Sequence, residues 1–172
     1  MRPMLVLAAA AIALPALAAP PPATVALKGP AGEDLGHAMV AQGPRGILVR
    51  IKARGLTPGW HGLHFHETGD CSSADFKSAG AHVHGAAPVV HGLLAEGSSD
   101  AGDLPNLYVA ADGTGVAEVF SSFVTLTGGD ARPALLDADG AAIVIHAAPD
   151  DHASQPIGGA GARVACGVIT GG

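Results

Sequence analysis

Histidine is the residue type in this chain most suited to metal binding or catalysis. Nine of the 172 residues are histidine. The segment Trp60-His-Gly-Leu-His-Phe-His66 holds three. Side chains alternate between the two faces of a β-strand, so His64 and His66 should point the same way and could hold one metal ion. His61 should point to the other face. A single pair of this kind is only moderately specific, and an incidental or structural role explains it equally well.

More potential ligands follow in two later segments. A long stretch without a strand pattern contributes three histidines and two carboxylates, and a later apolar run contributes a histidine: His82, His84, His91, Asp100, Asp103 and His146. Neutral imidazole and carboxylate together suit zinc or copper. The sequence therefore predicts a metal site assembled from separate segments of the chain.

Short β-type runs separated by turn signals must position these side chains. The expected strands are Thr24–Lys28, Leu35–Gln42, Gly46–Ala53, Gly59–His66, Leu107–Ala111, Gly115–Phe120, Phe123–Leu126, Ala141–Ala147 and Arg163–Ile169. After the N-terminal leader, no stretch long enough for a regular helix has helical periodicity. This favours an antiparallel sandwich or barrel. Two stretches, Glu67–Asn106 and Ala148–Ala162, interrupt the strands, and loops this long in a compact domain are usually functional.

Composition limits the class of protein. The 25 glycines and 13 prolines indicate a turn-rich folded domain. The 9 Lys and Arg against 15 Asp and Glu give a net charge of −6, which argues against a nucleic-acid partner.

The N-terminus has the pattern of an export signal. Arg2 precedes an apolar run from Met4 to Leu14, and Ala16-Leu17-Ala18 supplies a small-x-small cleavage site, so we expect residues 1–18 to be a signal peptide and 19–172 one domain. A transmembrane anchor is the weaker alternative, because Pro15 interrupts a run that is short for a bilayer. Export would expose Cys71 and Cys166 to an oxidising compartment, where we expect them to form a disulfide.

Five motifs in order resemble copper/zinc superoxide dismutases of the bacterial exported type, over nearly all of the expected domain. The motifs are His61-Gly-Leu-His-Phe-His66, Ser78-Ala-Gly-Ala-His82, Gly102-Asp-Leu-Pro-Asn106, Ile143-Val-Ile-His146 with Asp150, and Gly161-Ala-Arg-Val-Ala-Cys-Gly-Val-Ile169. The resemblance implies an all-β fold, an eight-stranded Greek-key β-barrel of the Ig-like sandwich kind with two long functional loops.

The resemblance also implies a role for individual residues. The copper ligands would be His64, His66, His82 and His146, with His82 shared with zinc. Zinc would also be bound by His91 and Asp103. Asp150 would link a copper histidine to a zinc histidine, Arg163 would lie beside the copper channel, and His61 would brace the loops without binding metal.

The chain departs from the family pattern at three places. Asp100 stands where the family has a third zinc histidine, and a carboxylate can also bind zinc. His84 replaces an expected asparagine; it is either an alternative zinc ligand or a solvated loop side chain. Lys77 resembles a lysine that steers substrate, although a solvated charge is an equal interpretation. Ala153 stands where related enzymes often have a lysine, so steering should be weaker here.

The resemblance implies an antioxidant oxidoreductase that converts superoxide to oxygen and hydrogen peroxide. Its cofactors would be copper and zinc, and superoxide would be its substrate. We expect a periplasmic protein, monomer or homodimer, that does not bind nucleic acid and leaves the membrane once the signal is removed. The alternative is a non-catalytic copper-binding or copper-buffering protein on the same scaffold. A metal-dependent hydrolase is a remote third candidate, because it needs an open, water-bearing zinc position with a nearby base.

Overall fold

The computed structural model describes residues 20–171. The expected signal peptide lies outside this range. No helix among the described residues is long and apolar enough to cross a membrane.

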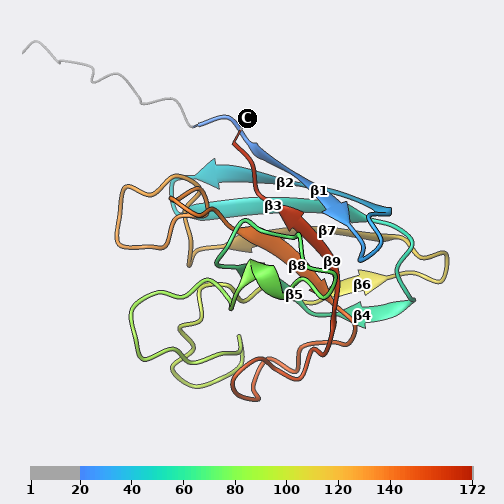
Figure 1. Ribbon diagram of the computed structural model, residues 1–172. Coiled ribbons are helices and arrows are strands. Elements are labelled where there is room, and N and C mark those ends of the chain that lie inside the picture. The colour runs from blue at the N-terminus through green and yellow to red at the C-terminus, as the bar shows by residue number, and fades with distance from the viewer. Residues whose placement is uncertain (1–19, 172) are drawn as a thin grey trace, which may run out of the picture.

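Nine strands and one short 3-10 helix make up the regular structure of the described chain (Figure 1). The strands are β1 (Ala23–Lys28), β2 (Asp34–Gly43), β3 (Gly46–Ala53), β4 (Gly59–His61), β5 (Leu63–His66), β6 (Leu107–Val109), β7 (Gly115–Ser121), β8 (Ala142–His146) and β9 (Arg163–Val168), and the helix is η1 (Lys77–Ala79).

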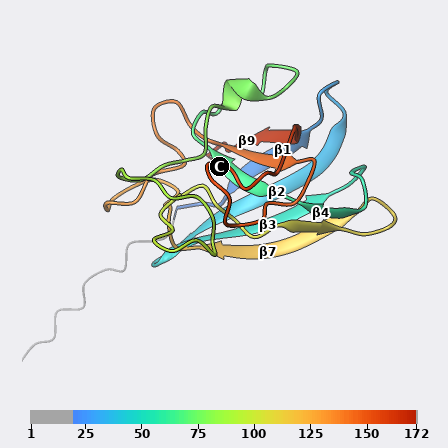
Figure 2. The same cartoon turned by 90° about the horizontal axis from the view of Figure 1, so that it is seen from below.

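The strands form one antiparallel sheet in the order β4-β6-β7-β3-β2-β1-β9-β8-β5. Its first and last strands, β4 and β5, are separated in the chain by Gly62 alone. The sheet therefore curls until its two ends meet, which forms a nearly closed barrel. The long strands β2, β3 and β7 run side by side along one wall of it (Figure 2).

Alternating burial builds the barrel core. In β1, Ala23, Val25 and Leu27 are buried and the residues between them are exposed, as the two-residue period of a strand requires. β8 differs, because all five of its residues are buried. Its outer face is covered by the segment that carries η1.

A second apolar cluster lies beneath that segment. Phe76 and Ala79 pack there with Ala142, Val144 and the half-cystine Cys166. Cys166 is bonded to Cys71, which confirms the expected disulfide. The bond fastens the first long loop to β9.

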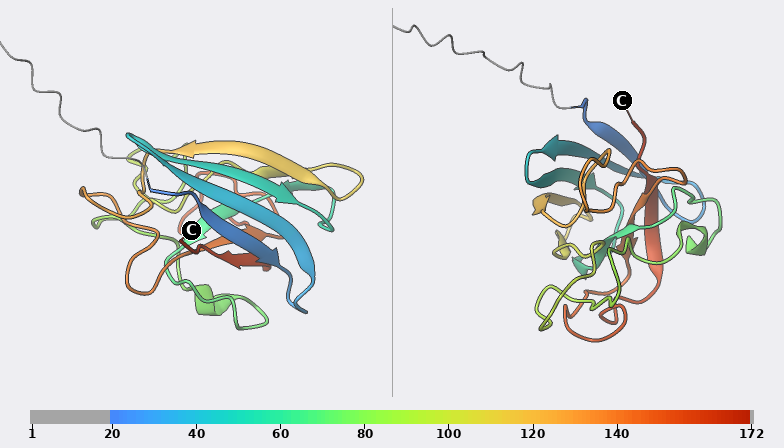
Figure 3. Two further views of the ribbon diagram at one scale, coloured as in Figure 1. Left: turned by 90° about the horizontal axis from the view of Figure 1, so that it is seen from above. Right: turned by 90° about the vertical axis from the view of Figure 1, so that its left-hand side faces the viewer.

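Both long loops lie on the same side of the barrel (Figures 1 and 3). The first loop adds to the free edge of β5, where Phe65 N donates to Gly102 O at 2.9 Å and Val83 N donates to Phe65 O at 2.9 Å. Gly102 permits this close approach, because a Cβ there would lie 2.5 Å from Phe65 O. The loop thus brings its histidines and aspartates against β5.

The antiparallel all-β expectation is confirmed, but two of its details are wrong. Nine strands are present instead of the eight that the resemblance implies. The expected run Gly59–His66 divides at Gly62 into two strands, of which β4 pairs with β6 and β5 with β8. The segment Phe123–Leu126 is not a strand, since its ladder is limited to one bridge between Thr125 and Ala134.

Candidate metal centre

Strand parity places the first histidines. On β5, Leu63 and Phe65 belong to the barrel core, whereas His64 and His66 face the opposite side, beneath the long loops. His146 ends the neighbouring strand β8. His82 lies on the first long loop and forms a bridge with His66.

These four histidines form one group. His64, His66, His82 and His146 are all buried, and one ligand-type nitrogen from each lies within 4.8 Å of the others. Three of them have one nitrogen held by an oxygen: His64 Nε2 by Asp150 Oδ2 at 2.7 Å, His66 Nδ1 by Gly80 O at 3.0 Å and His146 Nδ1 by Gly161 O at 3.1 Å.

The remaining nitrogens of those three histidines, His64 Nδ1, His66 Nε2 and His146 Nε2, are buried without a hydrogen-bond partner among the described residues. Leaving a buried polar atom unpaired is costly. Because the oxygens fix the position of the N–H in each ring, the unpaired nitrogens carry lone pairs that converge on one point. This donor set fits a copper ion.

A second group adjoins the first. His82, His91, Asp100 and Asp103 are buried, and one ligand-type atom from each again lies within 4.8 Å of the others. His91 Nδ1 is 2.8 Å from Asp103 Oδ1, yet this oxygen makes no hydrogen bond of good geometry. Two imidazoles and two carboxylates aimed at a common point fit a four-coordinate zinc ion.

His82 is shared by the two groups. Its Nδ1 lies 3.0 Å from Asp100 Oδ2 and 3.4 Å from Asp103 Oδ1, on the side of the carboxylates. Its ring stacks against that of His64, with centroids 4.1 Å apart. The imidazole of His82 is therefore placed to serve one ion with each nitrogen.

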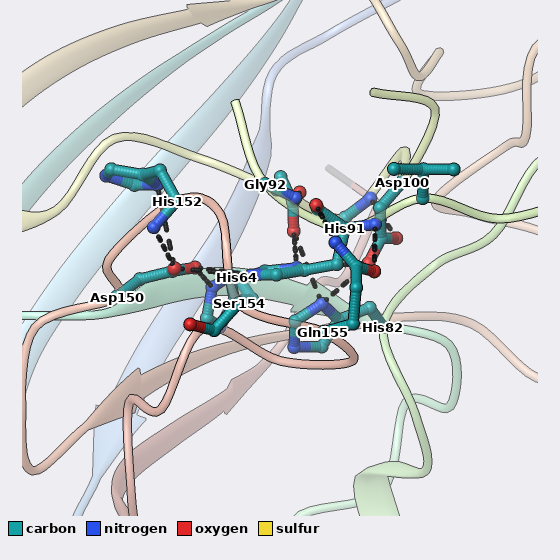
Figure 4. A network of polar contacts seen from close by, with 12 residues as sticks. His64, His82, His91, Gly92, Asp100, Asp150, His152, Ser154 and Gln155 are labelled. Carbon is teal, nitrogen blue, oxygen red and sulfur yellow. Dashed lines mark hydrogen bonds and ion pairs between the residues drawn. The ribbon is translucent and has the colours of Figure 1, made fainter. Parts of the chain in front are cut away.

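Asp150, on the second long loop, joins the groups from the other side. Its carboxylate holds His64 Nε2 at 2.7 Å and His91 Nε2 at 3.1 Å. Asn106 fixes the backbone of Asp150 twice, donating from Nδ2 to its carbonyl at 2.8 Å and accepting from its N–H at 2.9 Å. Figure 4 shows Asp150 and Asp100 at opposite ends of the histidines.

The pKa values of the buried histidines are shifted in opposite directions. Burial lowers the pKa of His64, lowers that of His66 to about 2 and lowers that of His146 to about 4. Burial also opposes the charged form of His82, but the hydrogen bonds and charges of Asp100 and Asp103 outweigh it and raise the pKa of His82 to about 9. The two carboxylates thus favour the protonated form of His82.

A cavity of about 660 Å³ leads to these residues, and His66, His82, His91 and His146 form part of its wall. Arg163 lies on the wall too, where it donates to Phe76 O and Gly80 O, each at 2.7 Å. Its charge is therefore fixed beside the histidines. Lys77 also lines the cavity, where its side chain is exposed and Nζ lies 3.0 Å from Asp75 Oδ2.

The other histidines lie outside the two groups. His61 is buried and makes contacts with His146 O at 2.6 Å and Thr57 O at 2.8 Å, so it fastens backbone segments together. His84 lies 3.1 Å from Asp100 Oδ1. The sequence alone predicts that His37 and His152 are surface residues. His37 is exposed, but the prediction for His152 is wrong because its side chain is only 17% exposed and packs beside Asp150.

Sequence reasoning missed one of the residues that join the two long loops. Gln155 donates from Nε2 to His91 O at 2.7 Å and accepts from His91 N at 3.0 Å, so its amide grips the backbone of a candidate ligand (Figure 4). No local pattern marks such a long-range pair. Asn106 ends the motif Gly102-Asp-Leu-Pro-Asn106, but its contact with Asp150 depends on the fold.

The fold and the paired groups define a β-barrel protein with two adjoining clusters of potential metal ligands that share one histidine. Comparison with known proteins identifies its family. The copper/zinc superoxide dismutase family matches residues 35–169. The chain is 60% identical over 147 residues to the Cu-Zn superoxide dismutase of Caulobacter vibrioides, covering 86% of this chain and 84% of that protein.

Solved structures agree with this match. A superoxide dismutase-like protein from Bacillus subtilis has a TM-score of 0.79 at 34% identity, covering 86% of this chain and 97% of that one. The Cu/Zn superoxide dismutase from Brucella abortus has a TM-score of 0.68 at 29% identity, covering 87% of this chain and 100% of that one. The chain belongs to the copper/zinc superoxide dismutase family.

Proposed function

We propose that the chain is a superoxide dismutase in which His64, His66, His82 and His146 hold copper, and His82, His91, Asp100 and Asp103 hold zinc. Two superoxide ions and two protons give one molecule of oxygen and one of hydrogen peroxide. Copper supplies the one-electron redox chemistry when bound. The observation that carries this proposal is the set of unpaired nitrogens on His64, His66 and His146 beside the cavity.

The protein's own residues bind, orient and supply protons. Asp150, Gly80 and Gly161 fix which nitrogen of each copper histidine carries its proton, so the other nitrogen is available as a ligand. His82 is the candidate proton carrier, because it lies on the cavity wall with one nitrogen beside carboxylates. We assign Arg163 and His82 the catalytic roles.

Arg163 attracts the anionic substrate. The chain carries a net charge of −6, but the screening length at physiological salt is about 8 Å, so distant acidic groups have little effect at the cavity. Arg163, held beside the histidines by two carbonyls, supplies a fixed positive charge there. The charge of Lys77 is balanced by Asp75 at 3.0 Å, so Lys77 should contribute less.

Export is part of the proposal. Residues 1–18 would be a signal peptide removed after Ala18, and the protein would work in the periplasm as a monomer or homodimer. The disulfide between Cys71 and Cys166 supports this location, because disulfides persist in oxidising compartments. The mass of the exported chain tests the cleavage site directly.

Superoxide decay, measured before and after copper loading, separates dismutation from copper buffering. The loaded protein should accelerate the decay catalytically. His146→Ala should abolish most of this activity while the barrel persists, because the copper group loses one of its four nitrogens. The exposed His37 offers a matched control, and His37→Ala should retain activity. Stoichiometric copper binding without turnover would favour the buffering protein, and full activity of His146→Ala would overturn the site assignment.

A further inference from the structure

The two oxygens of Asp100 make different contacts. Oδ2 faces the zinc group, 3.0 Å from His82 Nδ1 and 3.4 Å from His91 Nδ1. Oδ1 faces away from these rings, 3.1 Å from His84 Nδ1 and 3.4 Å from the backbone N–H of Gly102. Asp100 is 1% exposed, so water has little access to either oxygen.

His84 is placed differently from the candidate ligands. It follows His82 by two residues, and Val83 between them is fixed to β5 by a backbone hydrogen bond to Phe65. Its side chain is 38% exposed. Although it contacts Asp100, it belongs to none of the groups whose ligand atoms converge.

An aspartate that replaces a histidine ligand can bind a metal ion in more than one way. An imidazole presents one lone pair from a rigid ring, whereas a carboxylate presents two oxygens and can bind a metal ion through one or both. A hydrogen bond to one oxygen removes this ambiguity. Outer partners of this kind orient metal ligands and commonly change metal affinity by about 10- to 100-fold.

We propose that His84 is a positioning residue for Asp100. By donating its Nδ1–H to Oδ1, His84 directs Oδ2 toward the zinc ion and makes Asp100 a single-oxygen ligand. His84 and Asp100 together then replace one imidazole. This inference rests on the proposed zinc site and assigns its unusual ligand a specific partner.

Zinc affinity of the intact, disulfide-bonded protein tests the inference through competition with a chromophoric chelator. His84→Ala should lower zinc affinity by about 10- to 100-fold and leave copper content unchanged. His84→Asn keeps an N–H donor near the position of Nδ1, so it should restore most of the affinity. His37→Ala, which removes an exposed histidine far from Asp100 in the fold, should have no effect.

Cobalt at the zinc site gives a spectroscopic readout. Four-coordinate cobalt absorbs visible light more strongly than five-coordinate cobalt does. His84→Ala should therefore weaken the absorption, because Asp100 becomes free to bind through both oxygens, and His84→Asn should restore it. An unchanged spectrum and affinity in His84→Ala would overturn the inference.

A second background separates positioning from general loop stability. In Asp100→His the ligand has no second oxygen, so adding His84→Ala should leave zinc affinity unchanged. An equal loss in both backgrounds would show that His84 supports the loop and would overturn the inference. Asp103→Ala tests the proposed zinc site itself. Unchanged zinc affinity in Asp103→Ala would refute the site. If Asp103→Ala loses zinc affinity while His84→Ala keeps it, only the role of His84 is refuted.

Discussion

His64 Nε2, on a barrel strand, donates to the carboxylate of Asp150, on the second long loop, across 2.7 Å. Both side chains are fully buried. The same carboxylate reaches His91, so one loop residue controls the ring orientation of a candidate copper ligand and a candidate zinc ligand. The two metal groups are therefore coupled through Asp150 as well as through His82.

Asp150→Asn should weaken the binding of both metals, by about 10- to 100-fold each. The amide cannot accept from both histidines with the strength of a carboxylate, whereas the backbone contacts with Asn106 remain and hold the loop. Metal affinities measured by chelator competition check this. Asp112→Asn, an exposed aspartate on a turn, is the control. A loss confined to one metal would contradict the coupling.

Cys71→Ser should lower the free energy of unfolding. The bond closes a loop of 95 residues, which corresponds to about 4 to 5 kcal/mol in the chain-entropy account, or roughly 10 to 20 °C in melting temperature. Metal retention should also fall, because the same loop carries His82 and supplies the Gly80 carbonyl that holds His66 Nδ1. Thermal melts and metal content check this. Two free thiols in the unreduced exported protein would refute the pairing.

Arg163→Glu should slow dismutation. Reversing a focused charge changes association rates by about 10- to 1,000-fold, and the dependence of the rate on ionic strength should weaken or invert. Lys77→Ala is the comparison variant and should have a smaller effect, because Asp75 already balances that lysine. The superoxide decay rate across a salt series measures both. An unchanged rate and salt slope in Arg163→Glu would place the approach path elsewhere.

The metal-free protein should lose stability as pH rises from about 6.5 to about 9. The pKa of His82 is raised from 6.5 to about 9 in the folded state, so its stabilising contribution is complete below the unfolded value and is lost through the folded one. His146, with a pKa lowered to about 4, acts oppositely: its contribution is present above pH 6.5 and is lost as pH falls toward 4.

Thermal melts from about pH 4 to about pH 9 check both losses of stability, the acid one and the alkaline one. His82→Gln should lack the alkaline loss. Protein loaded with both metals should lack it as well, because metal binding requires an imidazole without that proton. An alkaline loss of stability of equal size in His82→Gln would assign the titration to another group.

Local pattern predicted much of the barrel. The run Gly46–Ala53 has the residue bounds of β3, because alternating apolar side chains and flanking turn residues are local signals. The division at Gly62 has a tertiary cause, because the residues before it pair with β6 and those after it pair with β8. Phe123–Leu126 has β-type composition but lacks a partner strand among the described residues, so composition alone was misleading.

The site shows the same limit. Strand parity correctly placed His64 and His66 together on β5, since parity depends only on local geometry. The contact between His84 and Asp100 depends on how the first long loop folds on itself. The contact between Gln155 and His91 joins two loops that are far apart in the chain. Neither contact has a short-range signal.

Metal stoichiometry tests the central claim most directly, namely that two adjoining sites share His82. The measurement is copper and zinc content per chain, on protein purified without chelators and assayed for dismutation in the same sample, with Asp103→Ala beside it. We predict one copper and one zinc per chain, and loss of zinc with slower catalysis in Asp103→Ala. A fully active protein that contains copper and never takes up zinc would contradict the account.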